Sequence, residues 1–175
     1  MIVVHIDTQK DTARLSRIYD GLAGVTLLYN PTRQEFEDEL TINDDNVVMF
    51  LGHGSSRGLF GYHEGYIIDA HNAYLLQDRV VIGIWCYASD FADMVGLHGY
   101  FTSMFISNFG EAYMLGFPNN TEEDIFSEID YFCDQIRGFI ENHTEMDTWV
   151  EILQENCHRE KDFVRFNYEA MAFFD

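Results

Sequence analysis

The chain has 175 residues, of which 47% are hydrophobic and 15% aromatic, so it can bury one substantial core and is too apolar to be disordered. Thirty acidic and ten basic side chains give a formal net charge of −20, which repels the phosphates of nucleic acids and anionic membrane surfaces. We therefore expect no direct nucleic-acid partner and no membrane partner.

The chain also lacks the marks of a secreted or membrane-anchored protein. No apolar run approaches the roughly 18 residues of a membrane-spanning helix, and no basic segment precedes the first apolar run as in a signal peptide. Three cysteines, at positions 86, 133 and 157, form neither an even set nor a Cys-x-x-Cys pair, which indicates free thiols. We expect a cytoplasmic protein.

The first part of the chain alternates between strand-like and helix-like stretches. A short β-branched run over residues 2–6 predicts a strand, and Asp11 is the expected cap of a helix that continues to Leu22. Residues 25–29 predict a second strand, which Asn-Pro closes, and residues 33–40 predict a short acidic helix.

Two almost wholly apolar runs dominate the middle of the chain. Residues 47–51 and 80–85 are typical of strands that are covered on both faces. Between them, the glycine-rich residues 54–68 predict a small hairpin. Residues 70–76 predict a helix capped by the preceding aspartate, Asp69.

The remaining elements are predicted from periodicity and from capping pairs. After a polar loop, apolar residues over 97–109 recur as on one face of a helix, and residues 112–117 resemble a strand. Thr121 and Thr144, each followed three residues later by an aspartate, predict the starts of two acidic helices over residues 121–160.

Alternating strands and helices predict an α/β fold with a mostly parallel sheet and helices on both faces. We expect a single domain over residues 1–175, with its core in residues 1–117. The acidic helices that follow are either an elaboration or the last layer that covers the sheet.

Two reactive side chains follow the two apolar strands. His53 comes directly after the first and Cys86 after the second. Loops at the carboxyl ends of neighbouring parallel strands share one edge of the sheet, so we expect the imidazole and the thiol to form a Cys/His dyad there. Gly54 would let a substrate carbonyl approach the backbone, where its N–H and that of Cys86 would stabilise an oxyanion.

The two motifs together resemble those of the clan CD cysteine peptidases, which include caspases, metacaspases, gingipain-type and separase-type enzymes, and especially the CHAT domains. In these families one apolar strand ends in His-Gly and another ends in the catalytic cysteine. The matching segments here are VVMFLGHGSS (residues 47–56) and VVIGIWCYAS (residues 80–89). These families usually carry a small residue at the position of Trp85, so we expect this bulky side chain to narrow the cleft.

The resemblance implies a caspase-like three-layer sandwich and a peptidase that acts through a thioester. It implies His53 as the proton-transferring histidine, Cys86 as the nucleophile, and the N–H groups of Gly54 and Cys86 as oxyanion donors. A peptidase of this kind requires no cofactor. The partner would be a peptide or protein substrate, and CHAT-type proteins often belong to larger effector complexes. Asp7, at the end of the first strand, would favour a basic substrate side chain or would serve only as a loop or cap residue.

Plainer interpretations stay open beside these. A cysteine at the end of a buried strand is often only a small core residue. His63, His71 and His98 match no metal-binding spacing, so we expect no metal site. The alternative function is a catalytically inactive caspase-like module whose acidic helices bind a basic protein partner.

Overall fold

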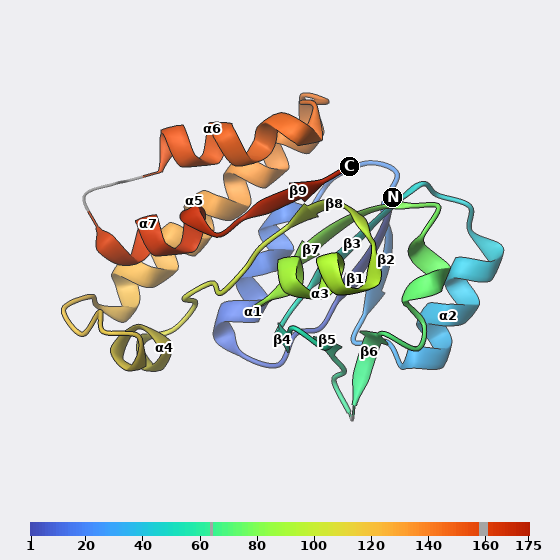
Figure 1. Ribbon diagram of the computed structural model, residues 1–175, viewed down its shortest axis with the longest axis horizontal. Helices are drawn as coiled ribbons and strands as arrows, with labels where there is room; N and C mark the ends of the chain where they lie inside the picture. The colour runs from blue at the N-terminus through green and yellow to red at the C-terminus, as the bar shows by residue number, and fades with distance from the viewer. Residues whose placement is uncertain (64, 158–160) are drawn as a thin grey trace.

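The computed structural model describes residues 1–63, 65–157 and 161–175 (Figure 1). Its main sheet contains β1 (Ile2–His5), β2 (Thr26–Tyr29), β3 (Val47–Leu51), β7 (Val80–Ile84), β8 (His98–Phe101) and β9 (Ala172–Phe174). The spatial order is β2-β1-β3-β7-β8-β9. The first five strands are parallel, and β9 runs antiparallel to β8. The prediction of an α/β fold with a mostly parallel sheet is confirmed.

Helices cover both faces of this sheet, because successive side chains of each buried strand point to opposite sides. Met49 and Ile82 belong to one apolar core, and Phe50 and Val81 belong to the other. The elements on the first side are α1 (Lys10–Arg14), η1 (Leu15–Ile18), α4 (Phe109–Met114), α5 (Glu122–Glu141), η3 (Met146–Thr148), α6 (Trp149–Asn156) and α7 (Asp162–Glu169).

The second face carries a smaller cover. It consists of α2 (Arg33–Ile42), η2 (Ala73–Leu76), α3 (Ala88–Val95) and a three-stranded antiparallel sheet of β4 (Gly54–Ser55), β5 (Gly58–Phe60) and β6 (Tyr66–Asp69). This small sheet extends from the main sheet in Figure 1. The predicted hairpin between the two apolar strands is therefore confirmed, with β6 as a third strand.

The long acidic helix α5 is a layer of the sandwich. Its apolar stripe, which includes Ile129, Phe132 and Ile136, is buried against the sheet. Its acidic side chains meet α1 and η1: Arg14 contacts Asp130 at 2.7 Å, and Arg17 contacts Asp134 at 2.8 Å. Together with β9, which pairs with β8, α5 shows that the chain after residue 117 contributes both a cover and a strand to the main sheet. Residues 158–160, at the end of the predicted acidic helices, lie outside the described residues.

The prediction of one helix over residues 97–109 is wrong. Residues 98–101 form β8, a buried strand, and α4 begins only at Phe109. The helical spacing arose from side chains of a strand and of the following loop that are buried together, among them Phe101 and Phe105. The segment after Cys86, predicted as a polar loop, forms α3. Residues 112–117 are not a strand, because Asn108 caps α4 and the helix continues to Met114.

Several predicted caps are also corrected. Asp69 is the last residue of β6, and only the short 3₁₀ helix η2 follows. Helix α1 begins after Gln9, so that Asp11 lies in its first turn. Thr121 caps α5 as predicted, but the Thr144 side chain caps no helix. The sequence reading missed α7 and β9. Over the described ranges, no helix is both long and apolar enough to cross a bilayer.

The two threonines provide a matched test of the capping assignment. Thr121 accepts a hydrogen bond from the Asp124 amide at 3.1 Å, and the Asp124 carboxylate accepts from the Thr121 amide at 3.0 Å. We expect Thr121→Ala to lower the free energy of unfolding by about 1 kcal/mol. Thr144→Ala should change it by less than about 0.5 kcal/mol. Urea unfolding followed by circular dichroism measures both values, and equal losses would contradict the assignment.

Candidate active site

His53 and Cys86 lie at the same edge of the main sheet. Strands β3 and β7 pair in parallel with Leu51 opposite Ile84, and each reactive residue lies two positions beyond that pair. Both residues line a small inner cavity of about 30 Å³, room for about one water molecule. Both also line an open groove of about 540 Å³ outside it. The structure therefore brings the two predicted residues together.

The turn that carries His53 is held by backbone hydrogen bonds and by a glycine. The N–H of Gly52 donates to the carbonyl of Ile84 at 3.2 Å, and the N–H of Phe60 donates to the carbonyl of His53 at 2.9 Å. Gly52 has φ +149°, and a Cβ atom there would lie 2.9 Å from the carbonyl oxygen of Ile6. Only glycine fits this position without strain. The His53 side chain is 24% exposed.

Gly54 and Trp85 fit together below the groove. A Cβ atom on Gly54 would lie 2.1 Å from Cδ1 of Trp85. The indole is buried against Phe50 and Phe91, and its Nε1 donates to the carbonyl of Ser55 at 3.2 Å. Trp85 borders the inner cavity but is not among the residues of the open groove. The small cavity that it borders also contains His53 and Cys86, and the expectation that Trp85 narrows the cleft stays a prediction.

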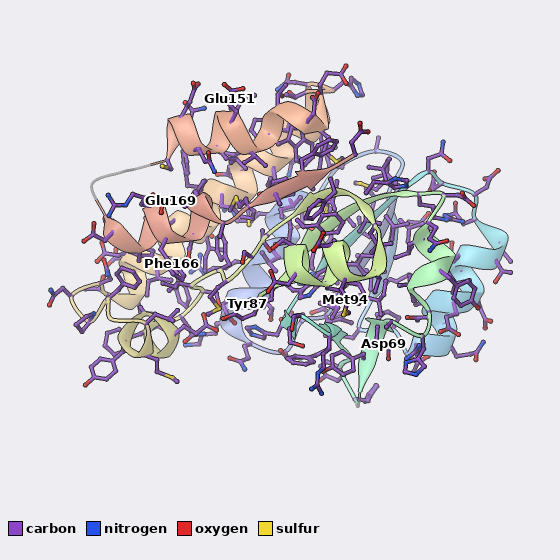
Figure 2. The ribbon with its side chains drawn as sticks, in the orientation of Figure 1. Asp69, Tyr87, Met94, Glu151, Phe166 and Glu169 are labelled. Carbon is purple, nitrogen blue, oxygen red and sulfur yellow. The ribbon has the colours of Figure 1, made fainter. Side chains whose placement is uncertain are left out.

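Cys86 lies in a tight turn between β7 and α3. The following residue, Tyr87, adopts φ +64°, an uncommon conformation for a non-glycine residue, and is labelled at the start of α3 in Figure 2. The Cys86 thiol donates to the carbonyl of Phe105, with Sγ 3.6 Å from the oxygen. Burial raises the pKa of Cys86 to about 11, more than the contact with Phe105 lowers it. The resting side chain is thus a neutral thiol.

Thr102, which follows β8, supports this turn from below. Its Oγ1 accepts the Trp85 N–H at 3.1 Å, and its own N–H donates to the carbonyl of Gly83 at 2.9 Å. Its carbonyl accepts the N–H of Ser89 in the first turn of α3 at 2.9 Å. Thr102 is completely buried, so these bonds tie the strand end and the helix start into one rigid unit. Nothing in the sequence pattern singled out this residue.

A second side chain that the sequence reading missed is Asp11. Its Oδ2 lies 3.5 Å from Nε2 of His53, and its side chain is only 3% exposed. Burial alone would raise the pKa of Asp11, but contacts with His53 and Ser107 hold it well below its usual range. The same contact raises the pKa of His53 against the opposing effect of burial. In the sequence, Asp11 was recognisable only as an acidic residue shortly after the first predicted strand. We interpreted this residue as a helix cap.

Two residues near α4 complete this polar group. The Ser107 hydroxyl donates to Asp11 Oδ2 at 2.6 Å, and the Ser107 amide donates to Glu111 Oε2 at 2.8 Å. Glu111 also borders the open groove beside His53 and Cys86. The site therefore combines a thiol, an imidazole and two carboxylates, contributed by segments at positions 11, 53, 86 and 107–111.

Asp7 and Gly54 occupy different places relative to this site. Gly54 borders the open groove. The Asp7 carboxylate accepts a hydrogen bond from the Tyr29 hydroxyl, and the Asp7 amide donates to Oδ1 of Asn30 at 2.8 Å. Asp7 belongs to neither the inner cavity nor the groove. These bonds give Asp7 a structural role at the end of β1, and its proposed preference for a basic substrate side chain stays a prediction.

In the described part of the chain, no three histidine, cysteine, aspartate or glutamate side chains are grouped so that they could hold a metal ion. The chemistry that the site can perform is proton exchange and nucleophilic attack. The half-buried sulfur of Cys86 would supply the nucleophile, and His53, made more basic by Asp11, would accept its proton.

The His53–Asp11 pair predicts a pH dependence of stability. Because the folded-state pKa of His53 lies above the reference value of 6.5, its protonation favours the folded state. The stabilisation is complete below pH 6.5 and is lost as pH rises through the folded-state pKa. We expect the difference in unfolding free energy between the wild type and His53→Gln to shrink over that window. Urea titrations from pH 5 to 9 measure it, and a difference that grows with pH would contradict the pairing.

Comparisons with models of known protein families, with curated proteins and with solved structures found no match to this chain. The assignment of a function therefore depends on the geometry of the site and on the resemblance of its motifs.

Proposed function

We propose that this protein is a cysteine peptidase with a caspase-like fold of the CHAT type, in which Cys86 is the nucleophile and His53 transfers protons. The observation that carries the proposal is the presence of both side chains in one cavity and one groove, at the ends of two adjacent parallel strands. Functional groups of open parallel sheets gather at this edge.

The proposed reaction has two stages. His53 accepts the proton of the Cys86 thiol, and the sulfur attacks the carbonyl carbon of the scissile peptide bond. The N–H groups of Cys86 and Gly54 stabilise the resulting oxyanion. The C–N bond then breaks as His53 returns the proton to the amine, which leaves a thioester. Water attacks the thioester while His53 removes its proton, and the acid and the free thiol are released. The reaction needs no cofactor.

The groove also supports a peptide or protein as substrate. Its lining includes the partly exposed aromatic rings of Phe60 and Tyr87, which are 39% and 40% exposed. Aromatic rings at a groove bind side chains of an extended peptide through apolar contact. A larger effector complex, which the CHAT resemblance implies, would deliver such a substrate in the cytoplasm.

Selective alkylation tests the proposed nucleophile. Cys133 is completely buried, and the Cys157 thiol donates to the carbonyl of Gln154 at 3.2 Å. At pH 7 we expect iodoacetamide to modify Cys86 at least about tenfold faster than either of them, because Cys86 shares a cavity with His53, to which it can pass its proton. His53→Ala should remove this advantage, and Cys86→Ala should abolish cleavage in a screen of mixed peptide substrates. Peptide mass spectrometry identifies the labelled site.

Equal labelling of the three cysteines, or cleavage that survives in Cys86→Ala, would overturn the proposal. Cys133→Ala is the matched control, since it removes a buried thiol that borders neither the inner cavity nor the groove and should leave labelling of Cys86 unchanged.

A second function, an inactive module that binds a basic protein, is favoured by the distribution of charge. Glu151 and Glu169 lie on the outer helices α6 and α7 (Figure 2). Most basic side chains are already engaged, which leaves the acidic surplus to the surface. Those that contact an acidic side chain or a backbone carbonyl are Arg14, Arg17, Arg33, Arg79, Arg137, Lys161 and Arg165.

Salt distinguishes the two functions. Binding of a lysine-rich peptide to an acidic surface should weaken at least about tenfold between 50 and 300 mM NaCl, because ions screen exposed charges. Turnover of a neutral peptide at Cys86 should change much less. Fluorescence anisotropy and cleavage rates measured on the same preparation decide between them: salt-sensitive binding without cleavage favours the acidic module.

A further inference from the structure

We propose that Asp11 is a positioning residue for His53, which holds the imidazole through Nε2 and leaves Nδ1 to exchange the proton of Cys86. This inference extends the proposed function, because it adds a third member to the proposed dyad. It stands on the position of Asp11 in the same cavity as the two reactive side chains, and on the hydrogen bonds that fix its carboxylate.

Both oxygens of Asp11 are held in place. Oδ1 accepts the N–H of Thr12 at 2.9 Å, and Oδ2 accepts the hydroxyl of Ser107 at 2.6 Å. The Ser107 hydroxyl also lies 3.1 Å from Glu111 Oε2. A hydroxyl has a single proton to donate, so Ser107 donates its hydrogen bond to the nearer oxygen, which is Oδ2 of Asp11. The carboxylate is therefore anchored from α1 on one side and from the segment before α4 on the other.

Among the residues that the structure describes, no lysine or arginine pairs with the charge of Asp11. In the described ranges its one ion-pair partner is His53, at 3.5 Å. Burying a carboxylate is costly without a paired charge, and an asparagine would keep one hydrogen-bond acceptor at this position without that cost. An aspartate at this position has an electrostatic effect that asparagine lacks, and that effect acts on the imidazole.

The separation also determines which nitrogen is engaged. Nε2 is buried and forms no conventional hydrogen bond, since 3.5 Å exceeds the usual N–H···O distance. The carboxylate oxygen that pairs with it is Oδ2 of Asp11. With its proton on Nε2, the neutral ring has its lone pair on Nδ1. No hydrogen bond to Nδ1 occurs in the portion of the chain that the structure describes, so this nitrogen is available to Cys86.

The expected consequence is a stronger proton acceptor. A carboxylate beside an imidazole stabilises the imidazolium, so less free energy is needed to move the proton of Cys86 onto His53. This matters because burial keeps the Cys86 thiol neutral, with a pKa of about 11. Asp11 would therefore act on the thiol through the histidine, without touching the substrate.

The test separates charge from shape. Asp11→Asn keeps the size of the side chain and removes the charge; its carbonyl oxygen can still accept from the Thr12 N–H, and its amide N–H can donate to the Ser107 hydroxyl oxygen. We expect a lower His53 pKa in Asp11→Asn than in the wild type, measured by NMR of the histidine ring and assigned with His53→Gln. Ser107→Ala should shift the His53 pKa upward, because the Asp11 charge is then less neutralised by a donor. Asp134→Asn, which removes a carboxylate paired with Arg17 on the surface of α5, should leave it unchanged.

Alkylation provides the second readout. We expect iodoacetamide to modify Cys86 about tenfold more slowly at pH 7 in Asp11→Asn, and the pH dependence of peptide cleavage to move with the His53 pKa. A merely structural role would lower the melting temperature without moving either the His53 pKa or the pH profile. Opposite shifts in Asp11→Asn and Ser107→Ala support the inference, and shifts in the same direction overturn it.

Failure of the inference differs from failure of the proposed function. If peptides are cleaved and the His53 pKa is the same in the wild type and in Asp11→Asn, Asp11 does not act on the histidine, while the peptidase assignment stands. If no peptide is cleaved but the His53 pKa falls in Asp11→Asn, the contact with Asp11 is established and the peptidase assignment is wrong.

Discussion

The parallel pairing of β3 with β7 is the interaction on which the site depends. The register places Leu51 opposite Ile84, and each strand then continues for two residues before its reactive side chain. Any other register would displace one of the two groups along the edge and, after a shift of one residue, turn it to the opposite face. Buried side chains on both faces of both strands hold this register, so the core determines the geometry of the site.

Polar side chains at the edge of the sheet stabilise the segments around His53 and Cys86. Thr102 joins the end of β7 to the start of α3, while Ser107 and Asp11 join the segment before α4 to α1. Thr102 and Asp11 are buried and Ser107 is half-buried, and each of the three has a hydrogen-bond partner. A buried polar network that is satisfied in this way fixes one arrangement of its members, because an unsatisfied member would cost free energy.

How much was predictable depended on the range of the interactions. The two central strands, the hairpin between them and the start of α5 were predicted, because runs of apolar residues and the Thr-x-x-Asp pair are local signals. The stretch from α3 to α4 was not. Its buried strand β8 has no alternating pattern, since both of its faces are covered, and Phe105 in the following loop is buried as deeply as a helix residue. The spacing of hydrophobic residues alone cannot distinguish a buried strand and loop of this kind from a helix.

The amino-acid sequence by itself determined the parallel α/β class, the acidic surface and the expectation that His53 and Cys86 meet at one edge, because a strand that ends in a reactive residue carries that residue to the strand's carboxyl end. Only the tertiary structure decided that Asp11 stands beside His53 and that Trp85 lies below the groove. It also decided that β9, the last strand, completes the main sheet. These contacts join residues that lie far apart in the chain, and which of them meet depends on how the helices pack across the sheet.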